Sequence, residues 1–427
     1  MDGDILATGR AERLPGVGWV TGGAVLAGYG PAAVAAACPE RAGSIPGVLE
    51  LAARWALPVV VRAGGTRPSF RLRRHLVLDL SRLPKDITID RDNHSARASA
   101  GVTVAALQQA AARQRLSYPP DPLSASTCTV GGTVATNAAG PGSVRYGSTA
   151  DYLLGLELVT ATGDVLHAGG QTLKNATGYD LSRLLAGSRG TLGVVTSVSV
   201  RLLPRVRARK SLLVEGRDLA GLAGHAATWS SLPTLARLEL VNDRARDQAG
   251  LEGAGTWLWA EFEGQPEELA RDTASIPGGR DVTRHRRQFW RSRLRLAAGL
   301  HDPSAWPVWV VLHPKRQEAG LRRLEALGGN AAVLFGHGAL GAWHAVWPWA
   351  IERDRLWDGL GETALSVEVG AEDHRWLQRA MGTAWPWFCR IKHEVDPAGL
   401  LDPEALGLDT ASQHDSSFGH SKPPGRE

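Results

Sequence analysis

Short apolar runs alternate with segments of helical periodicity over the first half of the chain. Val48–Ala56 has apolar side chains at helical spacing and is followed by the short apolar run Pro58–Val61, which predicts a helix and then a strand. A second helix is predicted over Val102–Arg115, and a further strand over Leu76–Leu80. The pattern therefore predicts an α+β fold.

Alternating apolar and polar residues predict more strands before residue 204. Leu156–Thr160 and Asp164–Ala168 flank a short turn that contains a glycine, which is typical of a hairpin. Val194–Pro204 alternates in the same way. Beyond residue 210 the composition changes, since thirteen of the fifteen tryptophans lie after position 228. This change predicts a second domain.

Composition limits the class of protein. The chain has 427 residues, 43% of them hydrophobic, and is long enough for two cores. No apolar run reaches the roughly 18–20 residues of a membrane span, and the first residues do not resemble a secretory signal, so we expect a cytoplasmic protein. The net charge of +5 comes from arginines spread along the chain without a continuous basic face, so we expect no nucleic-acid partner.

The cysteines argue against a metal centre in this chain. Cys38, Cys128 and Cys389 lie far apart, and none of them belongs to a C-x-x-C pair. This spacing encodes neither an iron–sulfur cluster nor a structural zinc site. We expect no metal here, and any iron–sulfur centre must come from another subunit.

A glycine-rich run between Tyr118 and Pro204 is the main chemical signal. Backbone N–H groups of such a run can approach a ligand closely, and its hydroxyls and amides add further donors, so it can wrap a pyrophosphate. A turn-rich stretch between strands has the same composition. Composition alone leaves both interpretations open.

The order of short motifs within this run is more specific. Six motifs follow one another: Pro119–Pro122, Cys128–Gly132, Ala135–Ala138, Arg145–Gly147, Lys174–Leu181 and Gly190–Val194. In this order they resemble the FAD-binding domain of the vanillyl-alcohol oxidase/p-cresol methylhydroxylase flavoproteins, in the branch of glycolate oxidase and D-lactate dehydrogenase. Upstream, Arg62–Thr66 resembles the pyrophosphate loop of this family, with Ala63 in place of one glycine.

The resemblance implies a domain plan. An N-terminal tail at residues 1–25 precedes a two-subdomain FAD-binding domain of the p-cresol methylhydroxylase type at residues 26–206. An α+β substrate or cap domain follows at residues 207–390. Residues 391–408 return to the FAD domain as a C-terminal helix, and the polar residues 409–427 form a disordered tail.

FAD is the cofactor that the resemblance implies. Thr66 stands where relatives with covalent flavin have a histidine, so we expect the FAD to be bound non-covalently. The resemblance also implies which residues contact each part of FAD. These are Arg62, Ala63, Gly64, Gly65, Thr66, Ser124, Thr127, Cys128, Gly131 and Gly132 for the diphosphate, Asp121, Asn137, Gly140, Tyr146, Gly147 and Asp151 for the ribityl and adenosine parts, and Thr191, Gly193, Val194 and Val195 for the flavin ring.

The catalytic motifs of the family are only partly present. Oxidation of a 2-hydroxy acid needs a cation for the carboxylate, a base for the hydroxyl proton and the flavin as hydride acceptor. Arg293 ends a Trp-x-x-Arg motif suited to carboxylate binding, but a helix with solvated arginines has the same pattern. His337 and His344 stand where the family has a metal-binding stretch, without its Asp and Asn. Both are candidate catalytic residues, although ordinary packed histidines fit the pattern better.

The resemblance implies an FAD-dependent oxidoreductase subunit that oxidises glycolate or a related 2-hydroxy acid by hydride transfer to flavin N5. Its expected partners are a homologous flavoprotein and an iron–sulfur subunit, and such a complex would allow association with the inner face of the membrane. The catalytic motifs, which lack some of the family's residues, resemble those of the smaller FAD-binding subunit of bacterial glycolate oxidases. They leave open two other functions: a non-catalytic scaffold or electron relay, and a stand-alone D-lactate dehydrogenase.

Overall fold

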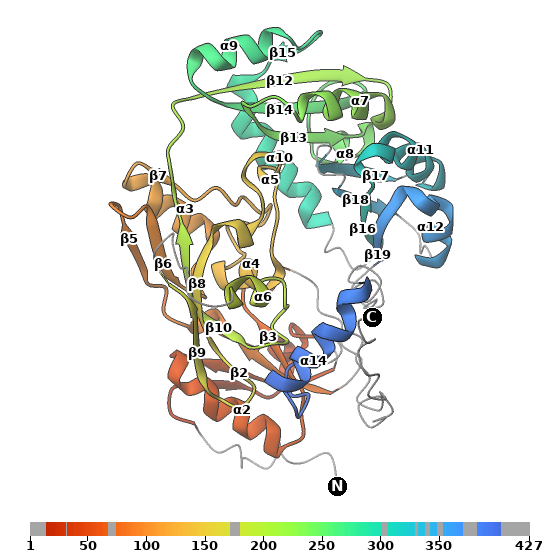
Figure 1. Ribbon diagram of the computed structural model, residues 1–427. Coiled ribbons are helices and arrows are strands. Elements are labelled where there is room, and N and C mark those ends of the chain that lie inside the picture. The colour runs from red at the N-terminus through yellow and green to blue at the C-terminus, as the bar shows by residue number, and fades with distance from the viewer. Residues whose placement is uncertain are drawn as a thin grey trace, which may run out of the picture.

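The computed structural model (Figure 1) describes residues 14–30, 32–66, 74–170, 180–299, 306–328, 332–337, 342–347, 353–369 and 382–402. The four-stranded and five-stranded sheets and the last described helix lie at one end of the molecule, and an eight-stranded sheet with its helices lies at the other. The predicted α+β fold class is confirmed. Within the described ranges, no helix has the length and apolar character needed to cross a membrane.

The first sheet has four strands in the order β1-β2-β4-β3. β2, β4 and β3 are parallel, and β1 pairs antiparallel with β2. α2 buries Ile45, Val48 and Leu49 against it, and a proline in its first turn needs no N–H donor there. Residues 17–25 are thus part of this sheet and its first helix, although we predicted a tail there. The elements are β1 (Val17–Val20), α1 (Gly23–Ala27), β2 (Ala33–Pro39), α2 (Ile45–Arg54), β3 (Val59–Arg62) and β4 (His75–Asp79).

The second sheet has five antiparallel strands in the order β5-β6-β10-β8-β9. The predicted hairpin is β8 and β9, and the predicted helix near residue 102 begins after Thr103, whose side chain caps it. The strands are β5 (Ile87–Asp90), β6 (Ser95–Ser99), β8 (Leu153–Val159), β9 (Val165–Gly169) and β10 (Val194–Arg201), and a separate pair is β7 (Leu116–Ser117) with β11 (Leu203–Pro204). The helices are α3 (Val104–Arg113), α4 (Val130–Thr136), α5 (Ser143–Tyr146) and α6 (Leu181–Leu185).

The third sheet has eight strands in the order β15-β12-β14-β13-β17-β18-β16-β19. Its strands are β12 (Ala208–Gly216), β13 (Leu235–Val241), β14 (Thr256–Gly264), β15 (Arg280–Asp281), β16 (Trp306–Leu312), β17 (Val333–His337), β18 (Ala342–Trp347) and β19 (Ala364–Val369). Its helices are α7 (Leu219–Trp229), α8 (Asp243–Gln248), α9 (Pro266–Ala274), α10 (Arg286–Gly299), α11 (Gln317–Gly328) and α12 (Arg353–Leu360). These elements fill the upper part of Figure 1.

The two faces of this sheet differ in chemistry because side chains alternate along each strand. One face carries mainly leucine and valine and packs against α7, α9, α11 and α12. The other face carries tryptophans and phenylalanines against α8 and α10, and also buried glutamates from β13 and β14. Side chains of this second face contact the first half of the chain, which makes it the face that meets the glycine-rich region.

The C-terminal segment returns to the first half of the chain, as predicted. α14 (Trp385–Val395) packs against the second sheet through Phe388, Ile391 and Val395. Beyond it, Leu401 forms a parallel bridge with Val59 of β3. Figure 1 shows α14 beside the strands of the first half of the chain.

Candidate functional site

Two glycine-containing loops that we predicted to bind the diphosphate lie side by side. A Cβ atom on Gly64 would stand 2.3 Å from the carbonyl oxygen of Thr127, so only glycine allows this approach. Both residues are exposed. Arg62 is held at the loop entry because Nη1 donates to the carbonyl of Gly28 at 3.0 Å and the guanidinium stacks on Tyr29. The exposed backbone of two adjacent loops is the arrangement that a diphosphate requires.

The second loop runs into α4 in a fixed geometry. Thr129 caps this helix, its hydroxyl accepting from the N–H of Gly132 at 3.1 Å. A Cβ atom on Gly131 would lie 2.5 Å from the Cβ of Ala100, so glycine is required for packing at this position. Cys128 is buried, and burial raises the pKa of its thiol to about 11. Cys128 and Gly131 therefore shape the loop from behind, whereas Thr127 lies on its exposed side.

The residues predicted for the ribityl and adenosine parts form one connected turn region. Asn137 adopts a left-handed conformation (φ 44°) at the end of α4, and its Oδ1 accepts from the N–H of Ala150 at 3.0 Å. Gly147 has φ +76°, and a Cβ atom there would collide with Asp151. The Asp151 carboxylate accepts from the N–H of Ser148 at 2.7 Å. Gly140 packs against Asp121, which brings the Pro119–Pro122 motif to the same place.

The segment predicted to lie beside the flavin ring leads into β10. Thr191, Gly193, Val194 and Val195 follow one another here, and the three side chains among them are buried. The carbonyl of Thr191 accepts from Nζ of Lys392 at 2.7 Å, so the C-terminal helix supports this segment. Residues 171–179, which include most of the Lys174–Leu181 motif, lie outside the described residues.

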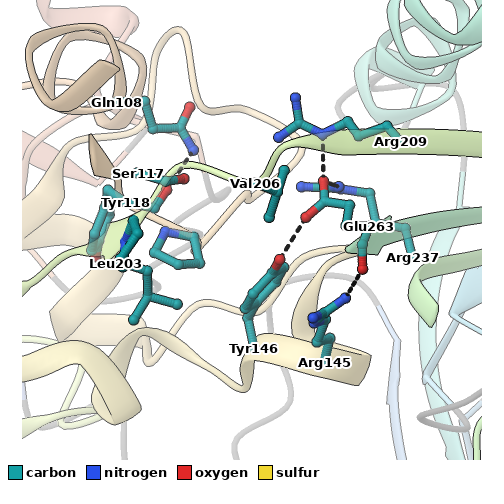
Figure 2. A pocket seen from close by; sticks show the side chains of 12 residues that line it. Gln108, Ser117, Tyr118, Arg145, Tyr146, Leu203, Val206, Arg209, Arg237 and Glu263 are labelled. Atoms are coloured by element: carbon teal, nitrogen blue, oxygen red, sulfur yellow. Dashed lines mark hydrogen bonds and ion pairs between the residues drawn. The ribbon is translucent and has the colours of Figure 1, made fainter. Parts of the chain in front are cut away.

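A seam of charged side chains joins the glycine-rich region to the eight-stranded sheet (Figure 2). Arg237 of β13 donates from Nε to Asp121 at 2.7 Å. Tyr146 donates to Glu263 of β14 at 2.5 Å. Arg145 donates to the backbone carbonyl of Glu263. Burial raises the pKa of Asp121, although Arg237 opposes this shift. Two predicted FAD contacts, Asp121 and Tyr146, thus bond the eight-stranded sheet, and Arg145 beside them does the same.

A cavity of about 390 Å³ opens at this seam. Arg145, Arg209, Arg237 and Glu263 line one side, and Tyr118 lies on the other side (Figure 2). Burial would raise the pKa of Glu263, but Arg237 and Arg209 lower it to about 2. Glu263 is therefore a charged anchor of the seam at neutral pH.

Arg293 is buried, so its interpretation as a solvated helix residue is wrong. Only 1% of it is exposed, and its Nε donates to Oε1 of Glu239 on β13 at 2.5 Å. The guanidinium carbon lies 4.0 Å from the ring centre of Phe335. The terminal nitrogens Nη1 and Nη2 have no hydrogen-bond partner among the described residues. These two nitrogens are buried, and they form the edge of the guanidinium that can pair with a carboxylate.

His337 belongs to the same cluster, and His344 lies next to it. Nδ1 of His337 stands 2.8 Å from Oε2 of Glu239, a close electrostatic contact in which neither atom makes a directed hydrogen bond. The His344 ring stacks on Phe335, with 5.1 Å between ring centres, and lies 6.2 Å from the ring of His337. In the part of the chain that the structure describes, no group of three His, Cys, Asp or Glu side chains is arranged to hold a metal.

Sequence reasoning missed the buried glutamates of the eight-stranded sheet. Glu239 and Glu261 have no exposed surface, and Glu263 has 2%. Their signal in the sequence is that each stands between apolar residues of a strand at a position that faces inward. Such buried carboxylates require cations. In this protein Arg293 supplies one for Glu239, and Arg237 supplies one for both Glu261 and Glu263.

The comparisons with known proteins agree with this geometry. A family model described as an FAD binding domain matches residues 33–169. The chain is 41% identical over 172 residues to a D-lactate dehydrogenase of Archaeoglobus fulgidus, covering 40% of this chain and 38% of that protein. It is 38% identical over 181 residues to the glycolate oxidase subunit GlcD of Bacillus subtilis, covering 41% of this chain and 38% of that protein. The chain thus matches less than half the length of these relatives.

Two further likenesses extend over most of the chain. An uncharacterized FAD-linked oxidoreductase of Mycobacterium tuberculosis is 29% identical over 424 residues, covering 88% of this chain and 91% of that protein. The crystal structure of p-cresol methylhydroxylase superposes with a TM-score of 0.72 at 15% identity, covering 92% of this chain and 94% of that chain. At this identity the likeness shows the fold. The exposed glycine loops fit FAD, and the resemblance seen in the sequence motifs is confirmed. The chain therefore carries an FAD-binding domain with the fold seen in p-cresol methylhydroxylase, and FAD is its cofactor.

Proposed function

We propose that this protein is an FAD-dependent oxidoreductase that oxidises a small 2-hydroxy acid to the 2-oxo acid. The observation that carries the proposal is the buried Arg293, whose Nη1 and Nη2 have no hydrogen-bond partner among the described residues and which shares Glu239 with His337. A planar guanidinium with two free N–H groups matches a carboxylate. The names of the relatives, D-lactate dehydrogenase and glycolate oxidase subunit, support the same class of substrate.

In this proposal the chain holds the substrate while the bound FAD supplies the hydride acceptor. Arg62–Thr66 and Ser124–Gly132 would hold the FAD diphosphate non-covalently, and Thr191–Val195 would lie beside the ring. Arg293 orients the substrate carboxylate through Nη1 and Nη2. His337 takes the hydroxyl proton at Nε2, the nitrogen opposite its contact with Glu239. The C–H bond of the hydroxy carbon breaks with its electron pair, and the C=O bond of the 2-oxo acid forms.

We propose further that the electrons leave the reduced flavin through a partner protein. Three of the relatives are named as glycolate oxidase subunit GlcD, which supports a function within a complex. The sequence has no C-x-x-C pair, which supports an iron–sulfur centre on another chain as the electron acceptor. Cys38, Cys128 and Cys389 are all free thiols, which supports a function in the reducing cytoplasm.

The test is an anaerobic titration of the FAD-loaded protein with glycolate and with D-lactate, followed by flavin absorbance. Bleaching by one acid is expected and identifies the substrate. Arg293→Lys should raise the dissociation constant of that acid about 10- to 100-fold, because a lysine cannot present the paired N–H groups. Arg291→Lys on the exposed side of the same helix is the matched control and should change nothing. A flavin that stays oxidised with each acid would instead support the scaffold or relay function.

A further inference from the structure

Glu239 contacts both of the side chains that the proposed function assigns to the substrate. Its Oε1 accepts from Nε of Arg293 on α10 at 2.5 Å, and its Oε2 lies 2.8 Å from Nδ1 of His337 on β17. All three side chains are buried: Glu239 is 0% exposed, Arg293 1% and His337 6–7%. One buried carboxylate on β13 therefore joins a residue of a helix to a residue of another strand.

The carboxylate is charged in this position. Burial would raise the pKa of Glu239, but the Arg293 guanidinium and His337 lower it to about 2. Burial also lowers the pKa of Arg293, and Glu239 opposes that shift. A buried charge is tolerated only where its partners are close and well oriented. The structure meets this condition for Glu239 through the hydrogen bond from Arg293, and His337 adds a second close contact.

The arrangement leaves Arg293 little freedom. The Nε contact with Glu239 and the stacking on Phe335 fix both the direction and the plane of the guanidinium. Among the described residues, Nη1 and Nη2 have no hydrogen-bond partner. A cation fixed in this way loses little conformational entropy when it binds a carboxylate.

The cluster lies close to the predicted FAD contacts. Arg237, two residues before Glu239 on β13, is bonded to Asp121. His337 is also near enough to Asp121 to affect its ionisation. The contacts of Glu239 are therefore part of the sheet face that meets the glycine-rich region.

We propose that Glu239 is a positioning residue that sets both substrate contacts at once. It turns the free edge of the Arg293 guanidinium toward the substrate carboxylate, and it holds His337 so that Nε2 meets the substrate hydroxyl. Glu239 itself touches neither substrate nor flavin. The inference rests on the proposed function and goes beyond it, because one carboxylate sets how Arg293, which binds the substrate carboxylate, and His337, which takes the proton, lie relative to each other.

The experiment is a double-mutant cycle on the FAD-loaded protein, with flavin reduction followed by anaerobic stopped flow. Glu239→Gln should lower the rate of flavin reduction at saturating substrate about 10- to 100-fold, as for other carboxylates that orient a histidine. It should also raise the substrate dissociation constant about tenfold. His337→Gln should lower the reduction rate alone. If Glu239 acts through His337, the double variant reduces its flavin no more slowly than His337→Gln does.

Asp272→Asn is the matched control for the loss of a buried carboxylate. Asp272 is 6% exposed on α9 and bonds Thr234. This variant should keep wild-type reduction and binding. The inference would be overturned if the rate loss of the double variant equalled the product of the two single losses. It would also be overturned if Glu239→Gln behaved like Asp272→Asn. Both outcomes leave the proposed function intact.

A second measurement separates the two proposals and requires no turnover. Binding of oxalate, which has the paired carboxylates but no hydrogen to transfer, is measured by calorimetry on the same FAD-loaded variants. Suppose that no 2-hydroxy acid reduces the flavin of the wild-type protein, but that Glu239→Gln binds oxalate more weakly than the wild-type protein does. This result would refute the proposed oxidation and would support the positioning of Arg293 by Glu239. Neither binding nor reduction in the wild-type protein would overturn both proposals.

Discussion

Replacement of Lys392 by methionine should destabilise the protein severely. Only 2% of Lys392 is exposed. Its Nζ donates to the carbonyls of Thr191 and Leu401, each at 2.7 Å, and pairs with Asp396 one helical turn away. Three parts of the chain therefore meet at one ammonium group: the segment that precedes β10, α14 and the C-terminal segment.

The magnitude follows from the groups that methionine would leave behind. Asp396 would remain a buried carboxylate with no cation, although it would still accept from the N–H groups of Leu400 and Leu401. Removal of one partner of a buried ion pair costs about 3–5 kcal/mol. Two carbonyls would also lose a donor, at roughly 1 kcal/mol or more each, but costs at one site are not additive. We therefore expect a loss of about 4 kcal/mol in the free energy of unfolding.

The assay is urea unfolding at saturating FAD, together with the FAD content of the purified protein. FAD content should fall as well, because Lys392 supports the segment that begins at Thr191. Lys85→Met, at an exposed position, is the control. Lys392→Met with Asp396→Asn should recover part of the loss, since the uncompensated charge is gone. A loss below about 1 kcal/mol in the single variant would refute the reasoning.

Two further predictions concern FAD binding and pH. Gly64→Ala should raise the FAD dissociation constant at least about tenfold, because the added Cβ would push Thr127 and the second loop away. The constant is measured by fluorescence titration, and Gly224→Ala, where a Cβ meets nothing within 4 Å, is the control. Equal FAD dissociation constants for the two variants would contradict the prediction. The pKa values of Glu239 and Glu263 are both lowered to about 2, below the roughly 4.3 of an unfolded glutamate. The stabilisation that these two carboxylates contribute is therefore present above the unfolded pKa and is lost as the pH falls toward 2. The free energy of unfolding, measured from pH 6 to pH 2, should decline less steeply in Glu239→Gln than in the wild-type protein. An equal slope in the two proteins would contradict this prediction.

The FAD loops could be predicted from the sequence because their signal is local. Glycines that permit a close approach, such as Gly64 and Gly131, stand in short motifs whose order is visible along the chain. The hairpin of β8 and β9 and the helix capped by Thr103 are also determined by neighbouring residues. The N-terminal strand β1 was missed because its pairing with β2 is decided by the sheet rather than by its own four residues.

The second domain could be predicted only as a change of composition. The partners of its buried glutamates come from distant positions, and Arg293 stands 54 residues from Glu239 along the chain. A charged residue in a strand suggests an exposed face unless its cation is known. For the same reason the sequence left Arg293 between a carboxylate clamp and a solvated helix residue, and burial alone decided against the second.

The bridge between Leu401 and Val59 has a consequence for the order in which the protein is made. The N–H of Val59 donates to the carbonyl of Leu400 at 2.7 Å, and that of Asp402 to the carbonyl of Val59 at 2.9 Å, so nearly the last described residues cover the edge of β3. During translation this edge stays open until the whole eight-stranded sheet has been synthesised. An open strand edge pairs readily with other chains. Fragments that end before residue 396 should therefore aggregate during synthesis rather than accumulate as soluble, inactive protein.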